Sequence, residues 1–394
     1  MSNGHEVNDV LIIGAGPAGV SAALSLRDVG LRPLLIDRAA DVGSSWRARY
    51  DRLRLNTGRR TSHLPGRPYP VGTAVFPTRD QVVAHLEHHA GESGIEQLLG
   101  TTVTRVDRDG SYWRVDTSAG PLWSRQVVVA TGYEHTPVMP NWPGLDGFDG
   151  AVLHSSAYRN AEPFRDGRVL VVGAGSSGME IVYDLAVGGA DSAWLAVRTP
   201  PNIMLRALPG GIPSDYLATP LFDAPSRLVD PLARLGGRIT VGDLSAFGLP
   251  TPSEGVFARG KRQGRAPVIV DREVIDAIRA GAFEVVPTIA HFDADGVTLI
   301  DGRRLDPDVV ICATGYHCGL GPILGHLGVL GADGHPRTQG SRTAAPGLRF
   351  LGFQSRPGLI GRVARESRAV ARSIAAELVA RHDERSLARC SESC

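Results

Sequence analysis

Three glycines near the N-terminus have the spacing of a phosphate-binding turn. Gly14, Gly16 and Gly19 fit the pattern G-x-G-x-x-G, and the apolar segment 10–13 stands directly before them. In such a turn the first glycine allows the bend, the second lets the backbone approach a pyrophosphate, and the third lets the following helix pack closely. The free N–H groups and the dipole at the start of that helix favour an anion. The residues expected to form this site are Gly14, Gly16, Pro17, Ala18 and Gly19.

The residue that ends the next apolar segment indicates a ribose site beside this turn. Residues 33–36 are predicted to form a second buried parallel strand, and Asp37 follows them. An acid about twenty residues after the glycines accepts hydrogen bonds from ribose hydroxyl groups. We therefore assign Asp37, with its neighbour Arg38, to the site of FAD or NAD.

The same pattern occurs a second time, with a base in place of the acid. An apolar strand is predicted at 169–172, a helix at 179–186 and a further strand at 193–197, which ends in Arg198. An arginine at this position pairs with a ribose 2′-phosphate, so the second unit is expected to bind NADPH, with Arg206 as a second candidate for the phosphate. The glycine turn of this unit consists of Gly173, Gly175, Ser176, Ser177 and Gly178.

Two further features are expected to surround the cofactors. The strands predicted at 126–129 and 309–312 each run into Ala-Thr-Gly, where small side chains would let the backbone approach a cofactor. These residues are Ala130, Thr131, Gly132, Ala313, Thr314 and Gly315. The segment 43–57 is rich in arginine and aromatic residues and is predicted to be a loop along the cofactor. Within it, Trp46 and Asn56 are the best candidates for residues around the reactive ring.

Composition limits the class of protein. A chain of 394 residues suggests two or three domains, and its net charge of +1 argues against nucleic acid or an anionic membrane as the main partner. No apolar run reaches the roughly 18 residues of a membrane-spanning helix, and the polar N-terminus does not resemble a signal peptide, so a cytoplasmic protein is expected. No metal-ligand spacing occurs, and four cysteines in a chain of this length do not form a disulfide framework.

These elements predict an α/β protein with two Rossmann-like dinucleotide-binding domains, doubly wound as in glutathione reductase. Short β segments at 103–106, 112–115 and 126–129, with a turn at Asp109-Gly110, predict a β-meander inserted in the first domain. The predicted boundaries are 1–160 and 305–394 for the discontinuous FAD-binding domain and 161–304 for the NADPH-binding domain. The Pro- and Gly-rich segment 199–267 is expected to be an insertion that forms a lid or a substrate wall.

One segment between the two units resembles a family fingerprint. Phe148, Gly150, His154 and Tyr158 fit F-x-G-x-x-x-H-x-x-x-[YF], which is typical of class B flavin monooxygenases, including FMO-like and Baeyer–Villiger enzymes. Further segments resemble the YUCCA-type members of this class over nearly the whole chain, at 50–55, 76–79, 248–250, 267–271 and 358–361. Two positions depart from that family: Gly43-Ser44-Ser45 has one glycine where two are usual, and Asn56 stands where the plant enzymes commonly have histidine.

The resemblance implies a monooxygenase that uses FAD, NADPH and O₂ through a C4a-hydroperoxyflavin and acts on a small organic substrate. It assigns Asn56, His154 and Trp46 to the catalytic centre, with His154 and its fingerprint partners docking the domains and positioning the cofactors. The reactions left open are YUCCA-like oxidative decarboxylation of a 2-oxo acid such as indole-3-pyruvate, oxygenation of nitrogen or sulfur, Baeyer–Villiger oxygenation of a ketone, and NADPH-dependent flavin reduction that passes electrons to a protein partner. A disulfide reductase is excluded because the first 311 residues contain no cysteine. The sequence leaves open whether two copies of the chain form a homodimer.

Overall fold

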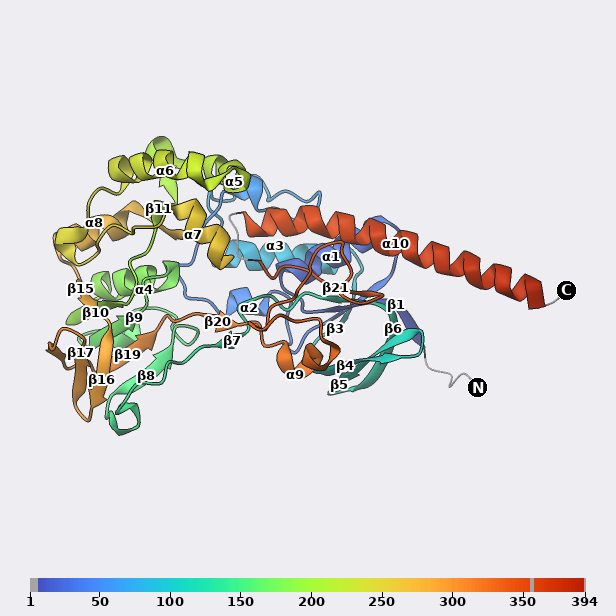
Figure 1. Cartoon of the computed structure of the whole chain (residues 1–394), viewed down its shortest axis with the longest axis horizontal. Helices are drawn as coiled ribbons and strands as arrows, with labels where there is room; N and C mark the ends of the chain where they lie inside the picture. Colours follow the sequence, from blue (N-terminus) through green and yellow to red (C-terminus); the bar gives the residue numbers. More distant parts are fainter. Residues whose placement is uncertain (1–5, 355–357, 393–394) are drawn as a thin grey trace.

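Two β-sheets, one in each half of the molecule, form its frame (Figure 1). The computed structural model describes residues 6–354 and 358–392, with side chains as far as residue 380. The first sheet contains, in spatial order, β3 (Glu96–Leu98), β2 (Pro33–Ile36), β1 (Val7–Ile13), β6 (Gly120–Val129), β5 (Tyr112–Thr117) and β4 (Val103–Asp109), with β21 (Leu348–Phe350) also paired to β6. The second contains β15 (Glu284–Pro287), β10 (Ser192–Val197), β9 (Arg168–Val172), β19 (Val309–Cys312) and β8 (Ala151–His154).

The first sheet confirms the predicted dinucleotide-binding unit and its meander. Strand β1 lies between β2 and β6 and pairs in parallel with both, and its apolar run 10–13 is almost fully buried, as a strand covered on both faces requires. Strands β4, β5 and β6 are antiparallel neighbours. Helix α1 (Pro17–Asp28) packs beside α10 (Leu359–Glu392), where the buried hydroxyl oxygens of Ser25 and Ser367 lie 2.8 Å apart. Helix α3 (Arg79–Glu92) begins at the N-cap Thr78 with a complete capping box.

The second sheet is entirely parallel and carries the second glycine pattern. Strand β9 leads into α4 (Ser176–Val187), and β10 pairs with both β9 and β15. Helix α8 (Arg272–Ala280) precedes β15, and a small antiparallel sheet of β16 (Ile289–Asp293), β17 (Gly296–Leu299) and β18 (Arg304–Leu305) follows. Strands β8 and β19 also belong to this sheet. Sheet membership therefore differs from the sequence-based boundaries, which place both strands in the first domain.

The insertion at 199–267 is mostly helical. It contains β11 (Ile203–Leu205), β12 (Ala207–Leu208), β13 (Ile212–Pro213), α5 (Asp215–Asp223), α6 (Ser226–Thr240) and α7 (Val256–Gln263). Strand β14 (Val268–Val270) then pairs in parallel with β11 and closes the insertion. In Figure 1 the helices α5 and α6 lie at the upper edge of the molecule, on the side of the second sheet. No helix of residues 6–354 and 358–392 is long and apolar enough to cross a membrane.

Two short strands connect the halves. Strand β7 (Thr136–Pro137) follows the first Ala-Thr-Gly, strand β20 (Tyr316–His317) follows the second, and the two pair antiparallel. We call this pair the connecting ribbon; it lies between the two sheets in Figure 1. The remaining short elements are α2 (Ser44–Arg47), α9 (Gly321–Leu324) and the 3₁₀ turns Arg59–Thr61, Leu145–Gly147, Glu162–Phe164, Pro209–Gly211, Ser245–Phe247 and Gly325–Leu327.

Candidate active site

The first glycine turn has one open side. Gly14 has φ +109°, and a Cβ atom there would lie 2.7 Å from the carbonyl oxygen of Ala130. A Cβ atom on Gly19 would lie 1.7 Å from the carbonyl oxygen of Gly14, so the contact of α1 with β1 requires glycine at both positions. A Cβ atom on Gly16 would instead meet nothing closer than Ser45 Oγ, at 3.9 Å. The space beside Gly16 is therefore free for a pyrophosphate at the start of α1.

Polar groups beside this turn fit the rest of an adenine dinucleotide. The Asp37 carboxylate accepts hydrogen bonds from the backbone N–H groups of Ala15, at 2.6 Å, and Ala39, at 2.9 Å, and so lies against the turn. Each carboxylate oxygen keeps acceptor capacity for a ribose hydroxyl. The Thr131 hydroxyl is buried and has no hydrogen-bond partner among the described residues, as expected of a group that pairs with a ligand. The side chain of Arg38 is exposed.

The second glycine turn repeats this geometry. Gly173 has φ +111°, and a Cβ atom there would lie 2.6 Å from the carbonyl oxygen of Ala313, as one on Gly14 would lie against that of Ala130. A Cβ atom on Gly175 would meet nothing within 4 Å. The Ser176 hydroxyl accepts a hydrogen bond from the backbone N–H of Ile269, at 2.9 Å, and so ties the turn to β14. Arg198 follows β10, is exposed, and forms no hydrogen bond or ion pair with a described residue. Its guanidinium is free for an anionic ligand.

His154 forms a hydrogen bond with Gly315, the residue directly before β20 of the connecting ribbon. Its Nδ1 accepts a hydrogen bond from the backbone N–H of Ser156, at 3.1 Å, so the proton of the neutral ring is on Nε2. Nε2 then donates to the carbonyl of Gly315, at 3.0 Å, and that carbonyl also accepts from the N–H of Val138, at 3.0 Å. Burial lowers the pKa of His154, which favours this neutral form. His154 is therefore a positioning residue for the segment between the two halves.

The other fingerprint residues support the same region. A Cβ atom on Gly150 would lie 2.4 Å from the ring of Phe148, so only glycine allows that ring to cover the start of β8. The Phe148 ring packs edge-on against Phe292, with ring centroids 5.2 Å apart. The buried Tyr158 hydroxyl donates to Asp184 on α4, at 2.7 Å. The fingerprint residues thus connect β8 and the segment after it to β16 and α4.

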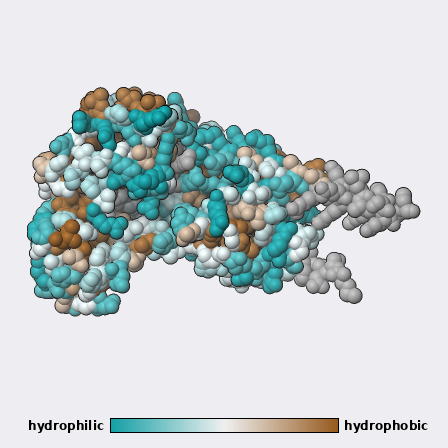
Figure 2. Space-filling model, in the orientation of Figure 1, coloured by the Kyte–Doolittle hydropathy of each residue, from teal (hydrophilic) through white to brown (hydrophobic). Residues whose placement is uncertain are grey.

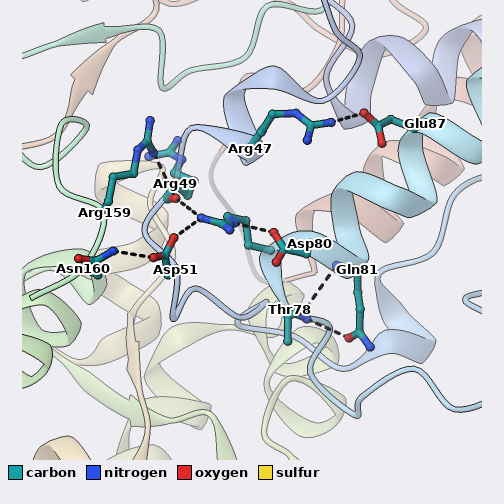
Figure 3. Close-up of polar contacts among 10 residues, drawn as sticks. Arg47, Arg49, Asp51, Thr78, Asp80, Gln81, Glu87, Arg159 and Asn160 are labelled. Carbon is teal, nitrogen blue, oxygen red and sulfur yellow. Dashed lines mark hydrogen bonds and ion pairs between the residues drawn. The ribbon is translucent and has the colours of Figure 1, made fainter. Parts of the chain in front are cut away.

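The segment 43–57 is held from both halves, and part of it differs from the prediction of a loop. Residues 44–47 form helix α2, whose Arg47 pairs with Glu87 on α3, and Trp46 is half-buried against the first core. The Asp51 carboxylate accepts a hydrogen bond from Arg79 at 2.6 Å. It also accepts one from Asn160 at 2.8 Å, and Figure 3 shows this contact. These contacts fix the segment 43–57, with Trp46 in α2 and Asn56 after it, relative to α3 and to the segment after β8.

A buried polar cluster lies between the halves, and most of its members were not predicted from the sequence. Arg206 pairs with Glu180 on α4 and with Asp271, at 2.7 Å, and its side chain is 1% exposed. Glu180 Oε2 accepts from the Tyr50 hydroxyl at 2.7 Å, and Arg206 donates to Asn56 Oδ1 at 3.4 Å. Burial raises the pKa of Glu180, although the guanidinium of Arg206 opposes this. We call these five residues the Arg206 cluster.

The Arg206 cluster bears on two residues that the sequence analysis assigned to the site. Because its guanidinium binds protein carboxylates, Arg206 is not free for a cofactor phosphate, and Arg198 remains the candidate. Because Arg206 donates a hydrogen bond to Asn56 Oδ1, the amide N–H₂ group of Asn56 is available to donate to another acceptor. A cavity of about 310 Å³ borders the cluster, with Glu180 and Asp271 in its wall. An arginine, a glutamate and an aspartate 26 to 91 residues apart in the sequence carry no local spacing signal that would have revealed this cluster.

Cysteine and metal chemistry find no support in the described part of the chain. Cys312 and Cys318 are buried, and burial raises the pKa of each thiol to about 11, which disfavours the reactive thiolate. Among the described residues, no group of three or more histidine, cysteine or carboxylate side chains could hold a metal ion.

Comparisons with known proteins identify the family. Residues 113–324 match the family described as flavin-binding monooxygenase-like, and residues 11–202 match that described as pyridine nucleotide-disulphide oxidoreductase. The indole-3-pyruvate monooxygenase YUCCA1 of Oryza sativa subsp. japonica is 34% identical over 366 residues, which cover 90% of this chain and 88% of that protein.

Solved structures agree with this assignment. A flavin-containing monooxygenase from Stenotrophomonas maltophilia superposes with a TM-score of 0.72 and 25% identity, covering 95% of this chain and 99% of that one. Cyclohexanone monooxygenase from Rhodococcus sp. Phi1 bound to NADP⁺ has a TM-score of 0.69 at 20% identity, covers 94% of this chain and 84% of that one, and supports the fold alone. The chain, with its two dinucleotide-binding turns, therefore belongs to the flavin-binding monooxygenase-like family and is a flavin-dependent monooxygenase.

Proposed function

We propose that this chain binds FAD at the first glycine turn and NADPH at the second, and uses them with O₂ to oxygenate a small organic acid. The observation that carries the proposal is the pair of open turns, with the acid Asp37 beside one and the free base Arg198 beside the other. When bound, NADPH supplies a hydride and the flavin supplies the reaction with O₂. The chain's part is to hold both cofactors and to keep water away from the reacting atoms.

The substrate class we propose first is a 2-oxo acid such as indole-3-pyruvate. Its support is the 34% identity, over 90% of this chain, to a protein named indole-3-pyruvate monooxygenase. The balanced reaction is R-CO-COOH + O₂ + NADPH + H⁺ → R-COOH + CO₂ + H₂O + NADP⁺. For this reaction we propose that the amide N–H₂ of Asn56 donates a hydrogen bond to the substrate or the flavin, because Arg206 already donates to its carbonyl oxygen.

A substrate panel tests this proposal. The holoenzyme is mixed with NADPH and with 2-oxo acids, amines, sulfides or ketones, and NADPH loss, O₂ uptake, peroxide and product mass are measured together. We expect 2-oxo acids to give the highest ratio of product to NADPH consumed. Coupled turnover of an amine, sulfide or ketone, with only peroxide from the 2-oxo acids, would contradict the proposed substrate class. Rapid reduction of cytochrome c without product would instead indicate the electron-transfer function.

Arg198→Ala is expected to raise the NADPH Michaelis constant about 30- to 100-fold and to leave that for NADH nearly unchanged. Pairing between a guanidinium and a 2′-phosphate is worth roughly 2–3 kcal/mol, and NADH has no such phosphate. The measurement is the steady-state rate of flavin-dependent O₂ uptake with each nucleotide. Arg32→Ala, which removes an exposed arginine before β2 and outside both glycine turns, is the matched control and should change neither constant. Equal use of both nucleotides by the unmodified protein would refute the assignment.

His154→Ala is expected to retain FAD but to divert electrons to peroxide. The Gly315 carbonyl loses one of its two donors, and a neutral hydrogen bond worth about 1 kcal/mol corresponds to a change of about fivefold in the rate or the coupling ratio. Peroxide release per NADPH and the rate of anaerobic flavin reduction measure the effect. His154→Gln, whose amide can still donate to the carbonyl, should recover part of the coupling. If the purified variant loses most of its flavin, and the molecules that keep it show normal coupling, the residue serves the first turn instead.

A further inference from the structure

Helix α6 presents a row of large apolar side chains to solvent. Leu228, Leu232, Leu235 and Ile239 are spaced four, three and four residues apart, so they share one face of the helix. They are 63%, 67%, 57% and 76% exposed. Figure 2 shows the apolar patch that they form at the upper edge of the molecule, where Figure 1 places α6. Soluble domains rarely expose apolar side chains in such a contiguous group unless the surface binds a partner.

The orientation of α6 is fixed by its other face. Val229 is buried against Phe222 and Phe257, and the Asp230 carboxylate accepts hydrogen bonds from the backbone N–H groups of Phe257, at 2.8 Å, and Ala258, at 3.1 Å. Asp230 thereby caps the start of α7 and ties the two helices together. A rotation of α6 that buried its apolar row would break these contacts, so the row faces outward in the folded protein.

A row of arginines runs along one edge of the apolar row. Arg227, Arg234 and Arg238 are spaced seven and four residues apart and therefore also share a face of α6. Arg227 and Arg238 form no hydrogen bond or ion pair with a described residue, and Arg234 donates to the Ser253 carbonyl. Asp230 is the only acid of α6, and it is buried. The exposed part of the helix is thus apolar and cationic.

From these rows we propose that α6 docks on an anionic lipid surface. The leucine and isoleucine side chains would enter the boundary between headgroups and acyl chains, and the long arginine side chains would reach the lipid phosphates beside them. A second copy of the chain fits less well, because a two-fold pair of α6 helices would bring the two arginine rows together or set each row against a helix whose one acid, Asp230, is buried. The net charge of +1 averages over the whole chain and does not reveal this local surface.

Vesicle sedimentation of the FAD-loaded protein tests the proposal. We expect the protein to sediment with vesicles of phosphatidylcholine and phosphatidylglycerol, and about tenfold less with phosphatidylcholine alone, because the arginines then lack anionic partners. Raising the salt concentration should weaken the binding, because salt screens exposed charges. Arg227→Gln/Arg238→Gln should weaken it about tenfold, and Leu232→Ser/Ile239→Ser by at least as much.

A matched control separates α6 from general surface hydrophobicity. Val187→Ser/Ile300→Ser also removes two apolar side chains, which are 54% and 65% exposed and lie outside the insertion, and it should bind vesicles as the unmodified protein does. Flavin content and NADPH oxidation in solution should be unchanged in every variant, since none of these residues belongs to the cofactor turns. Failure of the unmodified protein to bind the anionic vesicles would overturn the proposal. So would a dimer in light scattering that Leu232→Ser/Ile239→Ser converts to a monomer.

Discussion

Gly16→Ala is expected to yield a folded protein without flavin, because the added methyl group would occupy the space for the pyrophosphate and displace no protein atom. The nearest atom to the new Cβ is Ser45 Oγ, at 3.9 Å, so the apo fold has no reason to change. The flavin, in contrast, must bring its phosphates to the backbone at this residue. We expect the ratio of flavin to protein, measured from the visible absorbance of the purified variant, to fall more than about tenfold, which corresponds to the loss of one or two charge-assisted hydrogen bonds.

The matched variant Gly175→Ala separates the two turns. Its new Cβ would meet nothing within 4 Å, so this protein should also fold, stay yellow and retain FAD, but fail to be reduced by NADPH. Circular dichroism melts of both variants control for folding, and anaerobic bleaching of the flavin by NADPH gives the readout. If Gly175→Ala loses the flavin and Gly16→Ala retains it, the two turns have been assigned in the wrong order.

Arg206→Met is expected to lower the free energy of unfolding by about 3–5 kcal/mol, the usual cost of leaving one partner of a buried ion pair unpaired. The methionine approximates the length of the side chain but leaves Glu180, whose side chain is 10% exposed, without its cation. Urea unfolding at a fixed FAD concentration measures the change, since bound cofactor adds to apparent stability.

Replacing Glu180, which Arg206→Met leaves without a cation, should restore part of the lost free energy of unfolding. Arg206→Met/Glu180→Gln keeps no uncompensated buried charge, so we expect it to be more stable than Arg206→Met alone. Arg52→Met, which removes an arginine whose ion pairs are more exposed, should cost less than about 1 kcal/mol and is the matched control. An Arg206→Met protein as stable as the unmodified one would show that the cluster does not hold the halves together.

The repeated glycine turns could be predicted from the sequence because their requirements are local. The spacing of Gly14, Gly16 and Gly19 encodes the backbone geometry of the turn itself, and an acid or base at the end of the following strand comes at a fixed distance along the chain. The elements at 103–129 could be predicted for the same reason, since period-two alternation and an Asp-Gly turn encode an antiparallel meander.

The Arg206 cluster and the course of the strands between the halves could not be predicted in this way. Tyr50, Glu180 and Asp271 meet Arg206 only because the two halves pack together, and no pairwise spacing encodes that contact. Strands β8 and β19 are short and apolar, and their sequences fit either sheet. Their place in the second sheet follows from the pairing of Cys312 with His154 and Val172. The hydrogen bond between His154 and the Gly315 carbonyl, which joins residues 161 positions apart, likewise has no local spacing signal.

Turnover under ¹⁸O₂ tests the central claim, that this chain is a monooxygenase that divides one molecule of O₂ between substrate and water. The holoenzyme, NADPH and the best substrate of the panel are incubated under ¹⁸O₂, and the product is analysed by mass spectrometry. We expect every product molecule to contain one heavy oxygen atom and the second heavy atom to appear in water. Under coupled conditions one product molecule forms for each NADPH oxidised. Product without the label, or full recovery of the consumed O₂ as hydrogen peroxide with every substrate class, would contradict it.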